Sequence, residues 1–278
     1  MTSNDMDYRK IFETMVCQTE RYLTESRLKT MVLGFSGGLD STVTAAICHE
    51  VAKRNPALKF IGVSLPCSTN SAEENSSAAV AMHAFATECW VENLQKEYLL
   101  MRATCEQHYP STPISQGNIK ARLRMIYLYN IASVTGGLVM DTDNLTEHNL
   151  GFWTIHGDVA DLNPIGSLWK HEVYELCRYL FTEVYPSSDD PRHKALRAAY
   201  DITPTDGNGV ATGGDMAQIA PGHTYEEVDD ILASYLEHGQ QAVAALTQKY
   251  GEETVERVLS RHRNSAYKRQ SMPYVIKL

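Results

Sequence analysis

The chain alternates between short apolar runs and longer segments in which apolar residues recur every three or four positions. The longer pattern predicts amphipathic helices, because residues three and four apart lie on one face of a helix. The short runs end in turn residues and predict buried strands. We therefore expect helices at 6–27, 41–51, 72–87, 118–134 and 168–181, and strands at 30–35, 59–66, 90–94 and 138–140.

The last third of the chain has a different pattern. Residues 186–223 contain four prolines, five glycines and few large apolar side chains, which predicts an exposed, mobile loop. Helices are predicted again at 224–237 and 240–260. Strands that alternate with helices indicate an α/β fold, and no linker divides the chain. We therefore expect a single domain over residues 1–278, with a parallel sheet flanked by helices on both faces.

A glycine-rich turn, SGGLDS at 36–41, joins the first predicted strand to the helix that follows. Glycines let the backbone approach an anion closely and take positive φ. The free N–H groups at a helix start attract negative charge, and the hydroxyls of Ser36 and Ser41 add donors. Asp40 would repel phosphate unless it ligates Mg²⁺, which bridges carboxylate and phosphate oxygens. The turn therefore predicts a site for ATP and Mg²⁺.

The alternative interpretation of this turn is an ordinary strand–turn–helix with a tight Gly-Gly corner. The complete six-residue string in its strand–helix context favours phosphate binding. The string has no Gly-Lys-Ser/Thr and so differs from the Walker A pattern, which disfavours a kinase or motor that cleaves the γ-phosphate.

Three cations, Lys120, Arg122 and Arg124, lie near the start of the helix predicted from residue 118. Positive charge there opposes the helix dipole, so helix stability alone does not explain it. A solvated helix face is one explanation, and contact with the anionic oxygens of a ligand is the other. Lys170 stands in the same way at the start of the helix predicted for 168–181 and is a candidate phosphate partner.

The fourth predicted strand runs directly into the polar segment 141–147. The carboxyl edge of a parallel sheet is where α/β folds bind ligands. Glu147 is placed to complete a Mg²⁺ site with Asp40. The nearby Phe152 and Trp153 are interpreted as buried packing residues.

Composition and charge exclude some classes of protein. The formal net charge of −9 and the absence of a Lys/Arg cluster disfavour a nucleic-acid binder. The six cysteines form no C-x-x-C pair, which argues against a zinc or redox site. The polar start of the chain and the lack of a long apolar run predict no membrane contact, and we expect a soluble, cytoplasmic protein.

Taken together, the motifs resemble the NAD synthetases, a family of the N-type ATP pyrophosphatases. The similar segments are the SGGLDS turn, Gly117-Asn118-Ile119-Lys120-Ala121-Arg122, the stretch from Thr142 to Glu147, the Gly157–Asp161 loop, Lys170 and a late Lys-Arg. They occur in the family's order over about residues 30 to 270. The resemblance implies ATP-dependent amidation of deamido-NAD to NAD through an acyl-adenylate, with ammonia as nitrogen donor and AMP and pyrophosphate released.

The resemblance also implies roles for individual residues. Those assigned to ATP are Gly34, Phe35, Ser36, Gly37, Gly38, Leu39, Asp40, Ser41, Thr142, Lys170 and Thr205. Those assigned to deamido-NAD are Asn118, Arg122, Asp161, Tyr267 and Lys268. Asp40 and Glu147 are the implied Mg²⁺ ligands, and Asp40, Lys170 and Asp161 the implied catalytic residues, with Asp161 or Asp143 holding ammonium. The family forms homodimers, and its glutamine-using members carry an additional glutaminase domain that this chain cannot hold.

Several positions depart from the family pattern. Asp141 replaces a usual Gly, Tyr267 a common His, and Ser64 a frequent Arg, and the Gly157–Asp161 loop is one residue shorter. Ile155 replaces a substrate-binding Lys, whose role His156 or another cation would have to take. Two other hypotheses therefore remain: a related ligase with a different carboxylate or carbonyl acceptor, and a nucleotide-binding regulator without turnover.

Overall fold

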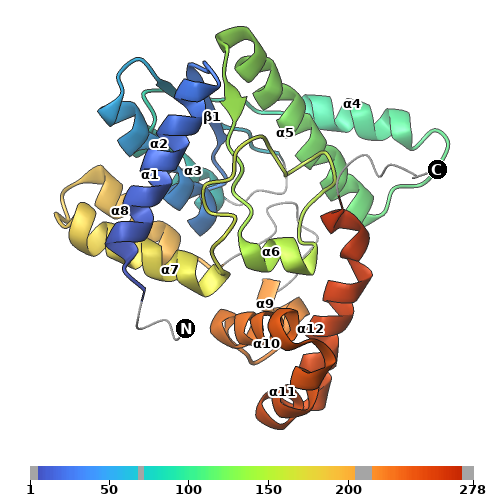
Figure 1. Ribbon diagram of the computed structural model, residues 1–278. Coiled ribbons are helices and arrows are strands. Elements are labelled where there is room, and N and C mark those ends of the chain that lie inside the picture. Colours follow the sequence, from blue (N-terminus) through green and yellow to red (C-terminus); the bar gives the residue numbers. More distant parts are fainter. Residues whose placement is uncertain (1–5, 68–71, 204–214, 271–278) are drawn as a thin grey trace, which may run out of the picture.

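The computed structural model describes residues 6–67, 72–203 and 215–270, and within them four parallel strands form one sheet in the order β3–β2–β1–β4 (Figure 1). The strands are β1 (Thr30–Gly34), β2 (Lys59–Ser64), β3 (Glu88–Val91) and β4 (Leu138–Val139). In the register, Val32 of β1 pairs with Ile61 on one side and Val139 on the other. After β3 the chain returns to the far side of β1. The strand order therefore reverses between β1 and β4, where the carboxyl ends of α/β sheets open into a ligand crevice.

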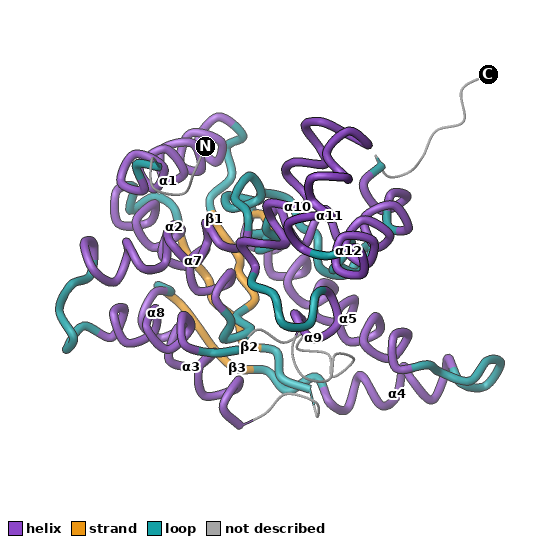
Figure 2. The backbone as a smooth tube through the Cα atoms, turned by 90° about the horizontal axis from the view of Figure 1, so that it is seen from below, coloured by secondary structure: helices purple, strands orange, loops and turns teal. Residues whose placement is uncertain are grey.

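Helices cover both faces of the sheet (Figure 2). Side chains alternate along β1, so Met31 and Leu33 enter one core and Val32 the other. The first face is covered by α1 (Tyr8–Glu25), α2 (Leu39–Arg54), α3 (Ala72–Phe85), α7 (Lys170–Tyr179) and α8 (Pro191–Asp201). The second face is covered by α4 (Gln95–Cys105) and α5 (Pro113–Thr135). The predicted parallel α/β sheet with helices on both faces is confirmed.

A third core lies beside the sheet and is built largely from C-terminal helices. Its helices are α6 (Leu145–Leu150), α9 (Asp215–Ile219), α10 (Tyr225–His238), α11 (Val243–Tyr250) and α12 (Glu252–Asn264). Three shorter helical segments are also present in the described residues: a π-helix at Leu180–Val184 and 3-10 helices at Gly239–Ala242 and Ala266–Arg269. Leu150 of α6 is buried against Val228, Leu232 and Val258. Because α6 follows β4 closely, this C-terminal layer packs against the ligand-binding edge of the sheet.

The predicted start of the long helix was wrong by five residues. α5 begins at Pro113, where Thr112 caps it through the backbone N–H of Ser115. Proline suits the first helical position, since its missing N–H would have no partner there. Lys120 therefore lies two turns into the helix, and the argument from the helix dipole does not apply to it. The preceding helix α4 was not predicted at all.

The predicted loop at 186–223 was also partly wrong, because it contains a packed helix, α8. Asp190 caps this helix with its side chain, Pro191 occupies the first turn, and the buried side chains of Ala195, Leu196 and Ala199 lie on one face. The prolines mark a helix start as well as loops. The single helix expected at 240–260 is divided at Gly251, whose φ of 85° does not fit a helix.

None of the helices in the described part of the chain combines the length and apolar composition that a membrane span requires. Of the six free cysteines, Cys48, Cys67 and Cys177 are buried.

Candidate active site

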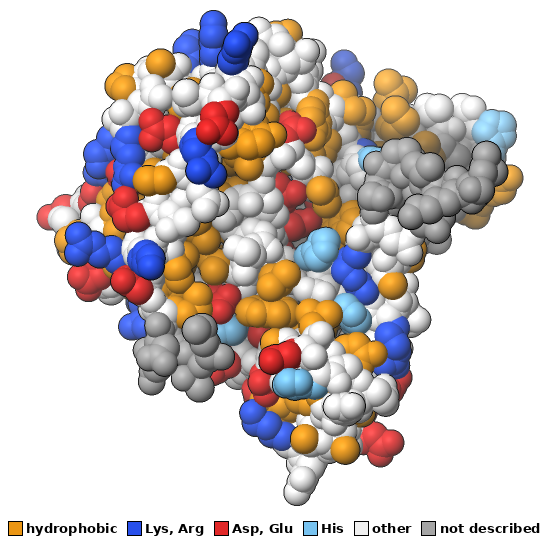
Figure 3. All heavy atoms as spheres, viewed as in Figure 1, with side chains coloured by type: hydrophobic (Ala, Val, Ile, Leu, Met, Phe, Trp, Pro, Cys, Tyr) orange, Lys and Arg blue, Asp and Glu red, His pale blue; other side chains and the backbone are white. Residues whose placement is uncertain are grey.

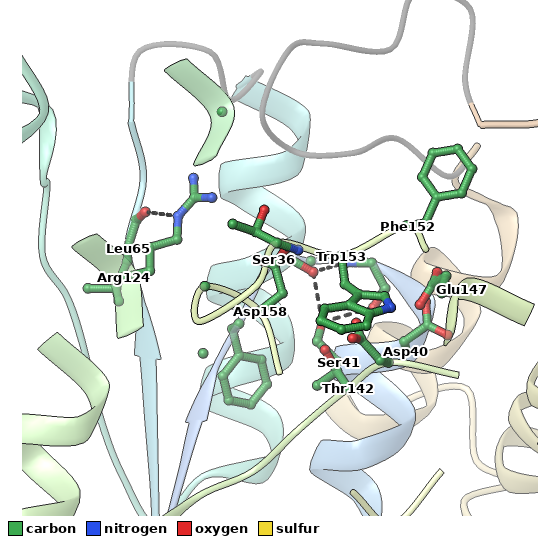
Figure 4. A pocket seen from close by; sticks show the side chains of 18 of the residues that line it. Ser36, Asp40, Ser41, Leu65, Arg124, Thr142, Glu147, Phe152, Trp153 and Asp158 are labelled. Atoms are coloured by element: carbon green, nitrogen blue, oxygen red, sulfur yellow. Dashed lines mark hydrogen bonds between the residues drawn. The ribbon is translucent and has the colours of Figure 1, made fainter. Parts of the chain in front are cut away.

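A cavity of about 880 Å³ lies at the carboxyl ends of the strands, at the reversal point between β1 and β4. Its wall combines the turn after β1, the segment after β4, the first residue of α7, one side of α5 and parts of α12 and the 3-10 helix that follows. Figure 4 shows Ser36, Asp40, Ser41 and Thr142 gathered at one part of this cavity, with Arg124 on the opposite side. The predicted ATP residues from Gly34 to Ser41, with Thr142 and Lys170, all lie along this wall.

The turn after β1 is stabilised by hydrogen bonds of its own hydroxyl groups. Ser36 Oγ lies 3.0 Å from Ser41 Oγ, and the Gly38 N–H donates to Ser36 Oγ. Gly37 has a φ of 84°, which favours glycine, whereas Gly38 has an extended conformation. Positive φ was expected at both glycines and occurs at Gly37 only. α2 begins at Leu39, so the first N–H groups of that helix lie beside the cavity and are suited to phosphate.

A buried lysine joins the two predicted metal ligands. Lys170 Nζ donates to a carboxylate oxygen of Asp40 and lies 3.0 Å from Glu147 Oε1, and its side chain is 3% exposed. Burial alone would lower the pKa of Lys170, but Asp40 and Glu147 outweigh it and raise that pKa well above the usual value. Burial raises the pKa of Glu147 to about 7, and Lys170 opposes the rise. Asn144, which caps α6, also donates to Asp40 Oδ1 at 2.9 Å.

Three aspartates in the segment after β4, Asp141, Asp143 and Asp158, lie close enough to one another to raise the pKa of Asp143. Asp141 is buried and accepts the N–H groups of Asp143 and Ala160, which ties the segment together. Asp158 accepts the Thr154 N–H. Asp143 Oδ2 is buried and has no hydrogen-bond partner among the described residues. Burial, then the neighbouring Asp141, Glu147, Asp158 and Asp40, raise the pKa of Asp143 well above its usual value. Asp143 and Asp158 line the cavity.

Two cations, Arg261 and Lys268, and two aromatic rings, Phe152 and Trp153, also line the cavity. Lys268 Nζ donates to the carbonyls of Gly151 and Trp153. Arg261 stacks over Phe152 with its guanidinium carbon 3.6 Å from the ring centroid. The expected buried packing role for Phe152 and Trp153 is incomplete, because both also line the cavity (Figure 4). Within the part of the chain that the structure describes, Trp153 Nε1 is buried and has no hydrogen-bond partner.

Arg124 lines the cavity on the opposite side from Phe152 (Figure 4) and donates to the Leu65 carbonyl at 3.1 Å. Leu65 follows Ser64, the position where the family pattern often has Arg. Because Arg124 of α5 contacts Leu65, it brings a cation next to that position. Asn118 lines the cavity too, and its Oδ1 accepts the Thr154 hydroxyl at 2.8 Å.

Other predicted substrate residues lie outside the cavity wall. Arg122 is exposed and donates to the carbonyl of Ile155. Asp161 accepts the Tyr129 hydroxyl and the Val139 N–H, both at 3.0 Å, so its carboxylate anchors the segment beside β4. Tyr267 is 59% exposed. Neither Ile155 nor the exposed His156 lines the cavity, and Thr205 lies outside the described residues.

The donor chemistry beside the turn fits Mg²⁺. Asp40 and Glu147 come from different elements and meet at Lys170, and carboxylate oxygens are ligands that Mg²⁺ prefers. Among the described residues, no group of three or more His, Cys, Asp and Glu side chains is arranged to hold a metal ion. Mg²⁺ in nucleotide sites is held by one or two carboxylates with phosphate oxygens, so this pair suits an ion that arrives with ATP.

A second cavity, of about 740 Å³, lies between α1 and residues 162–172. Most residues in its wall are apolar or uncharged, and the wall contains neither the glycine-rich turn nor the buried carboxylates. It therefore lacks the chemistry of the first cavity. On the face drawn in Figure 3, Lys and Arg side chains are interspersed with Asp and Glu and do not gather into one basic patch.

A parallel sheet with a glycine-rich turn suited to phosphate at its reversal point, and with paired carboxylates beside that turn, is typical of nucleotide-binding α/β enzymes. The chain belongs to the NAD synthase family, whose model matches residues 11–272. It is 30% identical over 252 residues to an NH3-dependent NAD⁺ synthetase from Wolinella succinogenes, covering 90% of this chain and 89% of that protein.

Solved structures agree with this membership. The NMN synthetase from Francisella tularensis superposes with a TM-score of 0.78 at 26% identity, covering 98% of this chain and 99% of that one. The NH3-dependent NAD synthetase from Campylobacter jejuni, solved with a nitrate ion, has a TM-score of 0.72 at 26% identity, covering 98% of this chain and all of that one.

Proposed function

We propose that this chain amidates deamido-NAD to NAD with ATP and ammonia, releasing AMP and pyrophosphate. The observation that carries the proposal is the cluster of Asp40, Glu147 and Lys170 beside the Ser36–Ser41 turn. A turn that binds phosphate, a carboxylate pair suited to Mg²⁺ and a buried cation are the groups that cleavage at the α-phosphorus of ATP requires.

In the first step the nicotinate carboxylate attacks the α-phosphorus of ATP and pyrophosphate leaves. The N–H groups of the turn and the Lys170 ammonium hold the phosphates and offset the charge that develops on the leaving group. Asp40 and Glu147 would hold Mg²⁺, which supplies charge neutralisation and orients the phosphate chain when it is bound.

In the second step ammonia attacks the acyl carbon of the adenylate, and AMP leaves. We assign the ammonium site to Asp143, with Asp158 beside it, because both line the cavity whereas the Asp161 carboxylate is engaged outside it. An unpartnered carboxylate attracts a cation, and because the pKa of Asp143 is raised, its ionised form accepts a proton more readily than an ordinary carboxylate. Ammonium bound there would lose its proton before attack.

The test is direct: purified protein is incubated with ATP, Mg²⁺, ammonium and deamido-NAD, and AMP and NAD are measured. Stoichiometric AMP and NAD support the proposal. Binding of ATP without any AMP would overturn it and favour a nucleotide-binding regulator. Replacing ammonium by glutamine should give no NAD, because the curated relatives that the chain matches are NH3-dependent synthetases.

The second candidate acceptor is the corresponding mononucleotide carboxylate. The observation that favours it is the similarity to an NMN synthetase over 98% of this chain. The same assay with nicotinate mononucleotide separates the two: the acceptor with the larger kcat/KM is the substrate. The basic end of the cavity, with Arg261 and Lys268, would serve the phosphate groups of either one.

We further propose a homodimer in a cytoplasmic setting. Large apolar side chains are exposed on α4 and α5, including Leu100 at 70%, Ile126 at 66% and Val134 at 75%. Exposing such an apolar surface to water is energetically unfavourable, and surfaces of this kind are typical of protein interfaces. Light scattering of the purified protein should give twice the mass of one chain, and Ile126→Glu should shift it toward the monomer.

A further inference from the structure

Asp229 is a buried carboxylate that lies outside the cavity and joins three helices. It belongs to α10 in the C-terminal layer and is 1% exposed. Its Oδ1 accepts the Thr146 hydroxyl from α6. Its Oδ2 accepts the His171 N–H of α7 at 3.0 Å and lies 2.8 Å from His171 Nδ1. Burying a carboxylate is costly unless such partners compensate it, so this contact is specific.

The two residues that Asp229 holds are each next to a residue of the cluster described above. Thr146 precedes Glu147 on α6, and His171 follows Lys170 on α7. Thr146 also links α6 directly to α7, because its hydroxyl oxygen accepts the backbone N–H of Lys170 at 2.8 Å. The starts of α6 and α7 are therefore fixed to one another through one hydroxyl and one carboxylate.

Capping of α7 alone does not explain this network. The Trp169 N–H at the start of α7 is already satisfied locally by Glu172, at 2.8 Å. An acceptor from α10 adds a constraint between separate helices, which a local cap cannot provide. What that constraint sets is the position of Lys170 Nζ relative to Glu147 Oε1, which are 3.0 Å apart.

We propose that Asp229 is a positioning residue for adenylyl transfer, which aligns Lys170 and Glu147 with the phosphates of ATP by holding Thr146 and His171. The inference rests on the proposed function. A displacement of about 1 Å costs on the order of 100-fold in rate, so Asp229→Asn should lower kcat about 10- to 100-fold. The KM for ATP should change little, because the turn at 36–41 is untouched.

The experiment measures exchange of labelled pyrophosphate into ATP in the presence of deamido-NAD, which reports the first step without ammonia. The matched control is Asp230→Asn, one position along the same helix, where the carboxylate accepts Tyr250 and Lys249 and faces away from Thr146. We expect wild-type kcat for Asp230→Asn. Thr146→Val should lose exchange as Asp229→Asn does, whereas Thr146→Ser keeps the hydroxyl and should restore it.

A double variant separates positioning from a general loss of structure. If Asp229 acts through Lys170, then Asp229→Asn should cost little further rate in a Lys170→Met background. Losses that multiply in the double variant would overturn the inference, as would wild-type kcat in Asp229→Asn. If Asp229→Asn does not fold, the comparison of Thr146→Val with Thr146→Ser decides, and equal rates for these two variants overturn it. Absence of exchange in the wild-type protein would instead refute the proposed function.

Discussion

Replacing Lys170 by Met removes the charge between two carboxylates while keeping most of the side-chain length. The Lys170 side chain is 3% exposed, and those of Asp40 and Glu147 are 16% and 22% exposed. Removing one partner of a buried ion pair costs about 3–5 kcal/mol, because the remaining charge is left buried. We expect a loss of unfolding free energy of this size at about pH 8, above the Glu147 pKa of about 7.

The size of this loss should depend on pH. A carboxyl with a raised folded-state pKa favours the folded state below its unfolded pKa, and this contribution is lost as pH rises through the folded pKa. In the wild type that folded pKa is about 7 for Glu147, and Lys170 holds it down. Without Lys170 the pKa lies higher, so the variant continues to lose stability above pH 7 when the wild type no longer does. The difference should grow by about 1.4 kcal/mol per pH unit there.

Urea unfolding at about pH 6, 7 and 8 measures the difference, with Lys249→Met as the control. Lys249 pairs with Asp230 at the surface, 63% exposed, so its loss should change stability little and equally at each pH. A stability difference for Lys170→Met that is the same at all three pH values would refute the assignment of Glu147 as the titrating partner.

Three further outcomes follow from the same contacts. Asp40→Asn should lower AMP release by about 100-fold or more with an unchanged far-UV spectrum, because it weakens the carboxylate pair that we propose holds Mg²⁺; unchanged turnover would contradict its role. Asp143→Asn should raise the unfolding free energy at neutral pH and flatten its fall with pH, since the raised pKa of Asp143 favours folding only at lower pH; urea titrations check this, and a less stable variant would contradict it. Gly62→Ala should destabilise the fold by about 1–3 kcal/mol, because its methyl group would lie 2.7 Å from Phe35 and 2.8 Å from Ala86; thermal unfolding that matches the wild type would show that the core adjusts.

The side of the cavity that holds the glycine-rich turn could be predicted because its information is local. The turn at 36–41 joins a strand to a helix within a few residues, and the strand pattern places Glu147 at the same edge of the sheet. The packed helix α8 was missed because its proline was interpreted as part of a loop, although proline also begins helices.

The contacts that hold this side together could not be predicted, because they join residues far apart in the chain. Asn144 donates to Asp40, 104 positions away, and Asp229 accepts from Thr146, 83 positions away. No periodicity or short motif reports such pairs. Arg261 was missed for the same reason, since α12 reaches the cavity only through the packing of the C-terminal layer.

The buried carboxylates of the cavity lower the folding stability of the free protein. Cations that neutralise them should therefore bind favourably. Burial raises the pKa of Glu147, Asp143 and Asp158, which means that ionising these groups costs folding free energy near neutral pH. The buried Lys170 ammonium offsets part of that cost for Glu147, and Arg124 and Lys268 offset part of it for Asp158. Cations that arrive with the substrates, Mg²⁺ with ATP and then ammonium, would relieve the rest. Substrate binding should therefore stabilise the protein more strongly as pH rises from about 6 to 8, because more of these carboxyls must then be ionised.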